Sequence, residues 1–275
     1  MFRLQKKRSW RILWRRVLPW LSVALLAAMV AVPLALFVWL FLFTEVFTVQ
    51  AITVVDAKDY TTKAAREIIE QTIDDLPLNR NIFFVPIQAI EAEIVAALPQ
   101  VRTVYVTRKL PGTIKAIVQE KTPELLLLSN SKYYFVDGDG VPYEEARLET
   151  LPGIVLPTVK NNDQKSQVTL GAAAVDVSFV AFLKKVQESL PECTGSQVAE
   201  IRIPSLAARE VHFTLNNNWR VLLDVTRSAE QQLSVLQRLL KETISEEEKQ
   251  TLEYIDLRIP NRVYYKAGSG SPGRE

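Results

Sequence analysis

The stretch from Val101 to Pro123, VRTVYVTRKLPGTIKAIVQEKTP, contains two apolar runs separated by the turn Leu110-Pro111-Gly112. The second run alternates apolar residues with mainly polar ones, which is the period of a strand with one buried face. The glycine can take the positive φ that tight turns require. We therefore predict two strands, Val101–Arg108 and Thr113–Glu120, joined as a hairpin.

Three further elements precede this hairpin. The β-branched, apolar segment Phe47–Val55 predicts a strand. Helical spacing of apolar residues predicts a helix over Thr61–Asp75, with Thr61 or Thr62 as its N-cap, and a second helix over Pro86–Leu98. The order is strand, helix, helix, strand, strand, and each helix has one apolar face. We expect both helices to cover one side of a small sheet.

The N-terminal 44 residues have the composition of a membrane anchor. Seven basic residues lie within positions 1–16, no acidic residue precedes Glu45, and residues 17–44 carry no charge. A helix of this length spans about 42 Å, against roughly 30 Å of bilayer hydrocarbon. We predict a cytoplasmic tail at 1–16 and a transmembrane helix at 17–44, with the remainder outside the cytoplasm.

A cleaved signal peptide is the alternative interpretation of this segment. Signal peptides have an apolar core of about 7–15 residues and a cleavage site of small residues. The uncharged run is longer than that, and residues 43–47 (FTEVF) offer no such site.

Beyond Pro123 the pattern changes to short strands. We expect a mixed β-rich domain over residues 122–266 and a flexible, Gly- and Ser-rich tail over 267–275. The β-rich domain is expected to contain two helices, Asp176–Leu190 and Ser228–Thr243, and Pro191 is expected to end the first of them. Glu246–Lys249 is expected to be a solvated turn. The last strands of the domain are expected at Tyr254–Ile259 and Val263–Tyr265.

The acidic segment Asp137-Gly138-Asp139-Gly140 permits two interpretations. An EF-hand calcium loop would need an oxygen-bearing side chain at its fifth position and Gly at its sixth. Those positions hold Val141 and Pro142. A hairpin turn is therefore favoured.

Four motifs stand out in the segments before the β-rich domain: Phe47-x-Val49-x-x-Ile52-x-Val54, Asn81-Ile82-Phe83, Leu110-Pro111-Gly112-Thr113-Ile114 and Glu120-Lys121-x-Pro123. With these motifs, the segments resemble a POTRA domain of the bacterial division proteins of the FtsQ/DivIB family. The closing stretch Tyr254–Val263 (YIDLRIPNRV) is similar to the end of the second extracytoplasmic domain of that family. One departure is Asp56, where glycine is expected to end the first strand.

The resemblance implies an α+β fold. A single transmembrane helix would be followed by a POTRA domain over residues 46–121, with the order β-α-α-β-β. The mixed β-rich domain over 122–266 would then follow.

Composition excludes several classes of function. The single cysteine, Cys193, excludes an intrachain disulfide, and the single histidine, His212, excludes histidine-rich metal sites. Alternation in its strand places His212 on the face opposite Val211 and Phe213, as a solvated residue. Outside the first 16 residues, 26 basic groups face 31 acidic ones, which argues against nucleic-acid binding. We expect no enzyme activity, cofactor or metal.

The remaining function is protein binding at a sheet edge. Proline cannot donate to a strand ladder, so Ile259-Pro260-Asn261 indicates a turn or edge before the last strand. The family resemblance implies that this terminal region binds the FtsB/DivIC–FtsL pair by strand addition, alongside other divisome components. The residues implicated are Tyr254, Arg258, Ile259, Asn261, Val263 and Tyr265.

We therefore expect a scaffold of the division complex, located in the cytoplasmic membrane at the septum. A different POTRA-containing secretion or envelope-assembly factor is one alternative, although such proteins usually carry tandem POTRA units and a β-barrel. A membrane-tethered wall hydrolase is another. It would need paired carboxylates across a cleft, or a Cys/His or zinc site.

Overall fold

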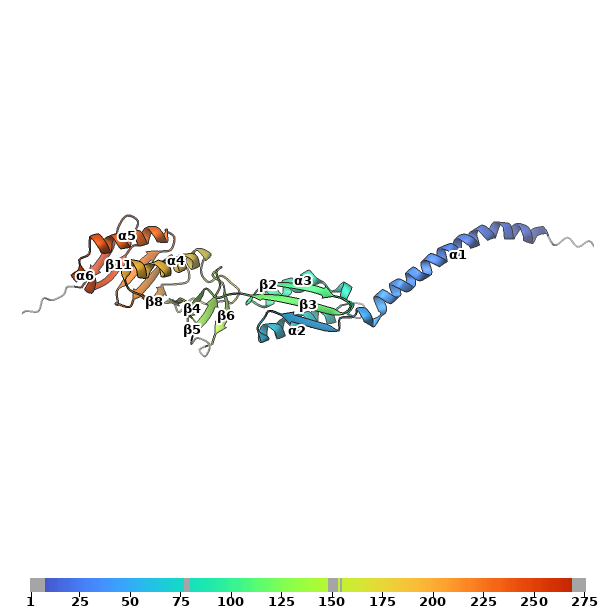
Figure 1. Ribbon diagram of the computed structural model, residues 1–275, viewed down its shortest axis with the longest axis horizontal. Coiled ribbons are helices and arrows are strands. Elements are labelled where there is room, and N and C mark those ends of the chain that lie inside the picture. Colours follow the sequence, from blue (N-terminus) through green and yellow to red (C-terminus); the bar gives the residue numbers. More distant parts are fainter. Residues whose placement is uncertain (1–7, 77–79, 148–152, 154, 269–275) are drawn as a thin grey trace, which may run out of the picture. The chain divides into compact units, whose positions relative to one another are not determined.

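A computed structural model describes residues 8–76, 80–147, 153 and 155–268 of the chain. The chain is α+β and divides into two compact units (Figure 1). The first unit comprises residues 1–98 and 103–119, and the second comprises residues 99–102 and 120–275. The expected segment 267–275 is described only in part, because residues 269–275 lie outside the described residues.

The N-terminal helix α1 spans Arg8–Phe43. It begins nine residues before the expected start at Val17, so residues 8–16 of the predicted tail are helical, because no helix breaker precedes Val17. The other tail residues, 1–7, lie outside the described residues. Where side chains are described, no helix is both long enough and apolar enough to cross a membrane.

The first unit has the predicted order of elements. They are β1 (Ala51–Val55), α2 (Asp59–Asp74), α3 (Ile87–Ala97), β2 (Val101–Lys109) and β3 (Thr113–Glu120), with the short 3-10 turns η1 (Glu45–Phe47) and η2 (Ile82–Phe84). The sheet order is β1-β3-β2, and β1 runs parallel to β3. Both helices bury isoleucines: α2 buries Ile69 and Ile73, and α3 buries Ile90 and Ile94. This is the small helix-covered sheet that the apolar stripes predicted.

Two predicted boundaries in this unit were wrong. The first strand begins at Ala51 rather than Phe47, because residues 45–47 form η1 and Thr48 bridges to Asn81. Helix α2 begins at Asp59, and its N-cap is Lys58, not Thr61 or Thr62. Thr61 is fully buried on the same helix face as Ile69, so its hydroxyl faces the core instead of capping the helix.

Asp56 adopts the left-handed conformation, with φ of 64°. This explains why the family pattern favours glycine there, since glycine has no Cβ to clash. Aspartate is one of the few other residues that tolerate this conformation, so the substitution preserves the turn after β1.

The second unit is built on one nine-stranded sheet of order β12-β11-β10-β9-β8-β7-β4-β5-β6. Most neighbours are antiparallel, but β11 with β10, β8 with β7 and β7 with β4 are parallel. The strands are β4 (Leu125–Ser129), β5 (Lys132–Val136), β6 (Pro142–Ala146), β7 (Thr158–Asn161), β8 (Val198–Ile203), β9 (Glu210–Leu215), β10 (Arg220–Asp224), β11 (Leu252–Asp256) and β12 (Tyr264–Ala267).

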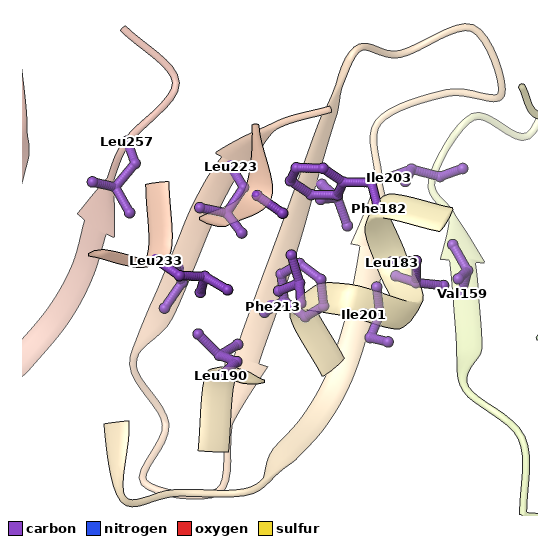
Figure 2. Close-up of a cluster of buried hydrophobic side chains, with 14 of the residues drawn as sticks. Val159, Phe182, Leu183, Leu190, Ile201, Ile203, Phe213, Leu223, Leu233 and Leu257 are labelled. Atoms are coloured by element: carbon purple, nitrogen blue, oxygen red, sulfur yellow. The ribbon is translucent and has the colours of Figure 1, made fainter. Parts of the chain in front are cut away.

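Two packed helices, α4 (Val177–Thr194) and α5 (Ala229–Glu242), supply the other half of the core. Figure 2 shows Phe213 within this cluster, with Leu190 from α4 and Leu233 from α5 nearby. Phe213 is fully buried, as the alternation in β9 predicted. The opposite face of β9 carries His212 as predicted, but His212 is half-buried rather than solvated.

The acidic segment after β5 is a turn. One carboxylate oxygen of Asp137 accepts hydrogen bonds from the backbone N–H groups of Asp139 and Val141, at 3.0 and 2.9 Å. The other lies 2.8 Å from Nζ of Lys121. The Asp137 carboxylate is thus engaged within the protein, which supports the hairpin interpretation.

Several predictions for the second unit were wrong. Pro191 lies inside α4, which continues to Thr194 and ends at left-handed Gly195; a proline in the last turn removes only one helical hydrogen bond. Residues Glu246–Gln250 form the short helix α6, because Ser245 and Glu248 make a capping box. The last two strands are β11 and β12, not Tyr254–Ile259 and Val263–Tyr265, and Ala267 belongs to β12 rather than to a flexible tail.

Alanine substitutions at Gly140 and Gly153 separate the energetic cost of a steric clash from the cost of backbone strain at positive φ. Both have positive φ, but a Cβ on Gly140 would lie 2.1 Å from the carbonyl oxygen of Val175, whereas one on Gly153 would meet no atom of the described residues within 4 Å. We expect Gly153→Ala to cost about 1 kcal/mol of unfolding free energy. Gly140→Ala should cost about 1–3 kcal/mol more.

The measurement is urea unfolding of the full chain in detergent. Trp219 is buried in the second unit and reports its unfolding once the other four tryptophans are replaced by phenylalanine. Equal unfolding free energies for the two alanine variants would contradict the close approach at Gly140.

Candidate protein-binding edge

Strand β12 is a terminal strand of the nine-stranded sheet. It pairs antiparallel with β11, with Ile255 opposite Tyr265 and Asp256 opposite Tyr264, and within the described residues it has no strand on its other side. Both tyrosines are partly exposed, at 45% for Tyr264 and 38% for Tyr265. Because successive residues point to opposite faces of a strand, β12 presents an aromatic side chain on each face.

A tight turn leads into this strand. The backbone N–H of Arg262 donates to the carbonyl of Ile259 at 3.3 Å, and Asn261 has φ of 59°. Proline followed by a left-handed residue is the residue pattern of a type II turn. Ile259 and Asn261 are exposed at this turn, whereas Val263 is half-buried against the core of the unit.

Arg258 connects this turn to the interior of the sheet. Its Nε and Nη2 atoms donate to the two carboxylate oxygens of Asp256, at 2.9 and 2.6 Å. Its Nη1 atom donates to Glu210 on β9, two strands away from β11. The arginine thus spans β10, on the face of the sheet opposite Phe213. Bidentate pairs of this kind fix geometry as well as charge.

The same cluster shifts the pKa values of its members. The hydrogen bond to the Asp256 carboxylate raises the pKa of Arg258 above its ordinary value, and the hydrogen bond to Glu210 raises it further. Burial works to raise the pKa of Asp256, but hydrogen bonds from Arg258 outweigh it and the net shift is downward. Burial lowers the pKa of His212, and the positive charges of Arg258 and Arg220 lower it further. Glu210 opposes this shift, because one of its carboxylate oxygens lies 3.2 Å from Nε2 of His212.

Hydrogen bonds fix the backbone of Leu257 to strand β10 and to Arg227. Its backbone N–H donates to the carbonyl of Leu222 on β10 at 2.9 Å, and its carbonyl accepts from Nη1 of Arg227 at 2.8 Å. Its side chain is buried. The segment between β11 and the turn is therefore fixed on both sides, which positions β12.

The arrangement offers a surface to which another strand could bind. Within the described part of the chain, no group of three or more His, Cys, Asp or Glu side chains is placed to hold a metal ion. Arg258 compensates one of the two negative charges beside it, so Arg258, Asp256 and Glu210 together carry a net charge of −1. The region has an edge strand, and the outer backbone groups of that strand can pair with a further strand. Exposed aromatic side chains lie on the same strand.

The structure brings together only part of the predicted set. Arg258, Ile259, Asn261 and Tyr265 lie on or just before the edge, while Tyr254 is half-buried on β11 and Val263 supports the core. The sequence-based set missed Tyr264, Glu210 and His212. The two-residue spacing of Glu210 and His212 places them on one strand face, but their meeting with Arg258 depends on the strand order.

Two family models match this chain, one in each unit. Residues 47–121 match the POTRA domain, FtsQ-type. Residues 126–258 match Cell division protein FtsQ/DivIB, C-terminal. The chain belongs to the FtsQ/DivIB family. Membership implies a role in cell division, and the match to the second domain favours this over a secretion or envelope-assembly factor.

One curated relative supports the assignment. The cell division protein FtsQ of Streptomyces bingchenggensis (strain BCW-1) is 28% identical over 131 residues. The alignment covers 47% of this FtsQ/DivIB chain and 47% of the relative, so the match spans about half of each protein.

Removal of Arg258 should destabilise the second unit of this FtsQ/DivIB protein. Arg258→Gln leaves the carboxylates of Asp256 and Glu210 without their cation, and we expect a loss of about 1–3 kcal/mol in unfolding free energy. Lys266→Gln is the matched control, because it removes the exposed pair with Glu253 at the same edge and should cost less than about 1 kcal/mol. Urea unfolding followed through Trp219 measures both; equal losses would contradict the proposed role of Arg258.

The lowered pKa of His212 predicts a pH dependence. The unfolded chain binds this proton more tightly than the folded one, so stability is lost as pH falls from the ordinary value of 6.5 through the lower folded pKa. Asp256 also contributes less at low pH, but below its ordinary pKa of 3.8. We expect His212→Gln to flatten the pH dependence of the unfolding free energy below about pH 6.5. An unchanged slope in that variant would assign the effect to other groups.

Proposed function

We propose that this chain is a non-enzymatic scaffold of the bacterial division complex, which binds an FtsB/DivIC–FtsL pair by adding a strand to β12. The observation that carries the proposal is the position of β12 at the end of the sheet. Among the described residues, β12 pairs with a strand on one side only, and it carries two exposed tyrosines. Main-chain hydrogen bonds would supply affinity, and side-chain contacts would supply selectivity.

The fixed geometry around Arg258 supports this mode of binding. A partner strand gains most when the receiving edge is already ordered, because binding then does not have to order the edge. Arg258 and Leu257 hold the entry to β12 through bonds to β9, β10 and Arg227. Tyr264 and Tyr265 add rigid aromatic area, which is enriched at protein interfaces.

We further propose that residues 17–44 anchor the protein in the cytoplasmic membrane, with the N-terminus in the cytoplasm and both units outside. Helix α1 covers all but the last residue of this uncharged run. Apolar side chains such as Trp20, Leu25 and Met29 are each more than 70% exposed along it. Such a surface is unfavourable in water and suits lipid. The basic residues before it match the positive-inside rule.

The decisive variant is Tyr265→Asp, which places a charge in the proposed interface. We expect capture of the FtsB/DivIC–FtsL pair by the full chain to weaken by at least about tenfold, which is the cost of roughly 1.4 kcal/mol. Tyr105→Asp is the matched control, since Tyr105 is an exposed tyrosine on β2 of the first unit. Affinity is measured by titration in detergent.

Folding is checked in the same samples. Tyr265 is 38% exposed but lies opposite the buried Ile255, so a loss of capture is attributed to the interface only where the variant keeps a cooperative urea transition. Undiminished capture by Tyr265→Asp and by Tyr264→Asp would overturn binding at β12. Mid-cell accumulation of a fluorescent fusion tests the division role separately, and an even distribution over the membrane would count against it.

A further inference from the structure

Three phenylalanines pack together where the end of α1 joins the rest of the first unit. The ring of Phe41, near the end of α1, lies 4.4 Å from that of Phe83 in η2 and 5.1 Å from that of Phe47 in η1, measured between centroids. Phe47 and Phe83 are 5.4 Å apart. The side-chain amide of Asn81 donates to the carbonyl of Phe41 at 3.2 Å. The helix end is therefore joined to the unit by specific contacts.

The turn η2 is built to point phenylalanines outward. Ile82 before them and Val85 after them are fully buried, so Phe83 and Phe84 face away from the core. Arg108 on β2 donates to the carbonyls of Ile82 and Val85, at 3.0 and 2.5 Å. The turn is thus fixed to the sheet, and the outward rings are not the result of a loose loop.

Further apolar side chains are exposed at the same end of the unit. Val46 of η1 is 55% exposed, Phe84 of η2 is 43% exposed, and Leu110 in the β2–β3 turn is 60% exposed. The backbone N–H of Gln50 donates to the carbonyl of Gly112 at 2.7 Å, which places this turn beside the segment after η1. We call Val46, Phe84 and Leu110, with the three packed phenylalanines, the apolar collar.

The length of the uncharged run sets the depth of this collar. The run of 28 residues exceeds the hydrocarbon thickness by about 12 Å, or roughly 6 Å at each end. About four residues at its C-terminal end would then lie in the interfacial layer, and Phe41 is among them. Aromatic rings are favoured in this layer. The rings that pack on Phe41 would lie at the same level.

We propose that the apolar collar inserts into the interfacial layer of the outer leaflet and holds the POTRA-type unit against the lipid surface. The proposal rests on the proposed anchoring of α1. Lipid is the occupant because the collar continues the exposed apolar surface of α1 through Phe41. Single exposed apolar residues are ordinary, but three from separate segments around a packed aromatic cluster indicate an interaction surface.

The test uses the full chain in lipid nanodiscs of phosphatidylethanolamine and phosphatidylglycerol, at one copy per disc. With Cys193→Ala as background, an environment-sensitive dye is attached through Phe84→Cys, Val46→Cys or Leu110→Cys. Lipids carry a spin label either at the headgroup or near the end of the acyl chain. Controls are Tyr105→Cys and Val95→Cys, exposed positions of the same unit away from the collar, and Val32→Cys within α1.

We expect dye at all three collar positions to shift to shorter emission wavelength and to be quenched by headgroup-labelled lipid, with no quenching at the two controls. Dye at position 32 should be quenched by chain-labelled lipid. Quenching at position 32 without quenching at the collar overturns the collar and leaves the anchor intact. Absence of quenching at position 32 overturns the anchor and the collar together. A collar shift that appears only with several copies per disc would assign the surface to a second copy, not lipid.

Discussion

The pairing of Arg258 with Asp256 and Glu210 is the interaction on which the binding edge depends. It joins the segment after β11 to β9 across an intervening strand, by charge-assisted bonds on the face opposite the core. Strand β12 is held by its ladder with β11, and Arg258 fixes the segment that leads from β11 into it. Leu257 and the turn at Pro260 complete this support. The edge proposed to bind a partner is therefore ordered by contacts within the chain.

The two proposed surfaces have different physical demands. The edge of the second unit needs open backbone groups and exposed tyrosines in water. The collar of the first unit needs apolar side chains that are favourable only beside lipid. A scaffold that recruits other proteins near a membrane benefits from both, because attachment to a surface raises the effective concentration of its partners. Neither function requires a catalytic group.

Local patterns were sufficient to predict most elements. Alternation identified the buried faces of β3 and β9, and apolar stripes identified α2, α3, α4 and α5. The predicted ends of elements were wrong where tertiary contacts, rather than the local sequence, determine where a strand or helix begins. Thr61 resembled a capping residue but is buried, and residues 47–50 resembled a strand but pair with Asn81 and the hairpin turn instead. Pro191 failed as a stop signal because one missing bond in a last turn costs little.

The position of the candidate site stays a prediction, and the contacts that build it could not be predicted from the sequence. The family resemblance indicated the terminal region, and Pro260 indicated a turn. The role of Arg258 could not be read from sequence, because its partner Glu210 is 48 residues away. Only the order β11-β10-β9 brings them together. The face occupied by Tyr264 likewise depends on tertiary pairing, because Tyr264 lies opposite Asp256 on β11.

Amide hydrogen exchange of the full chain, with and without the FtsB/DivIC–FtsL pair, tests the central claim most directly. Strand addition pairs the outer backbone groups of β12, so exchange within Tyr264–Ala267 should slow on binding while β6, at the other end of the sheet, keeps its rate. Binding that slows exchange elsewhere and leaves β12 unchanged would contradict the account.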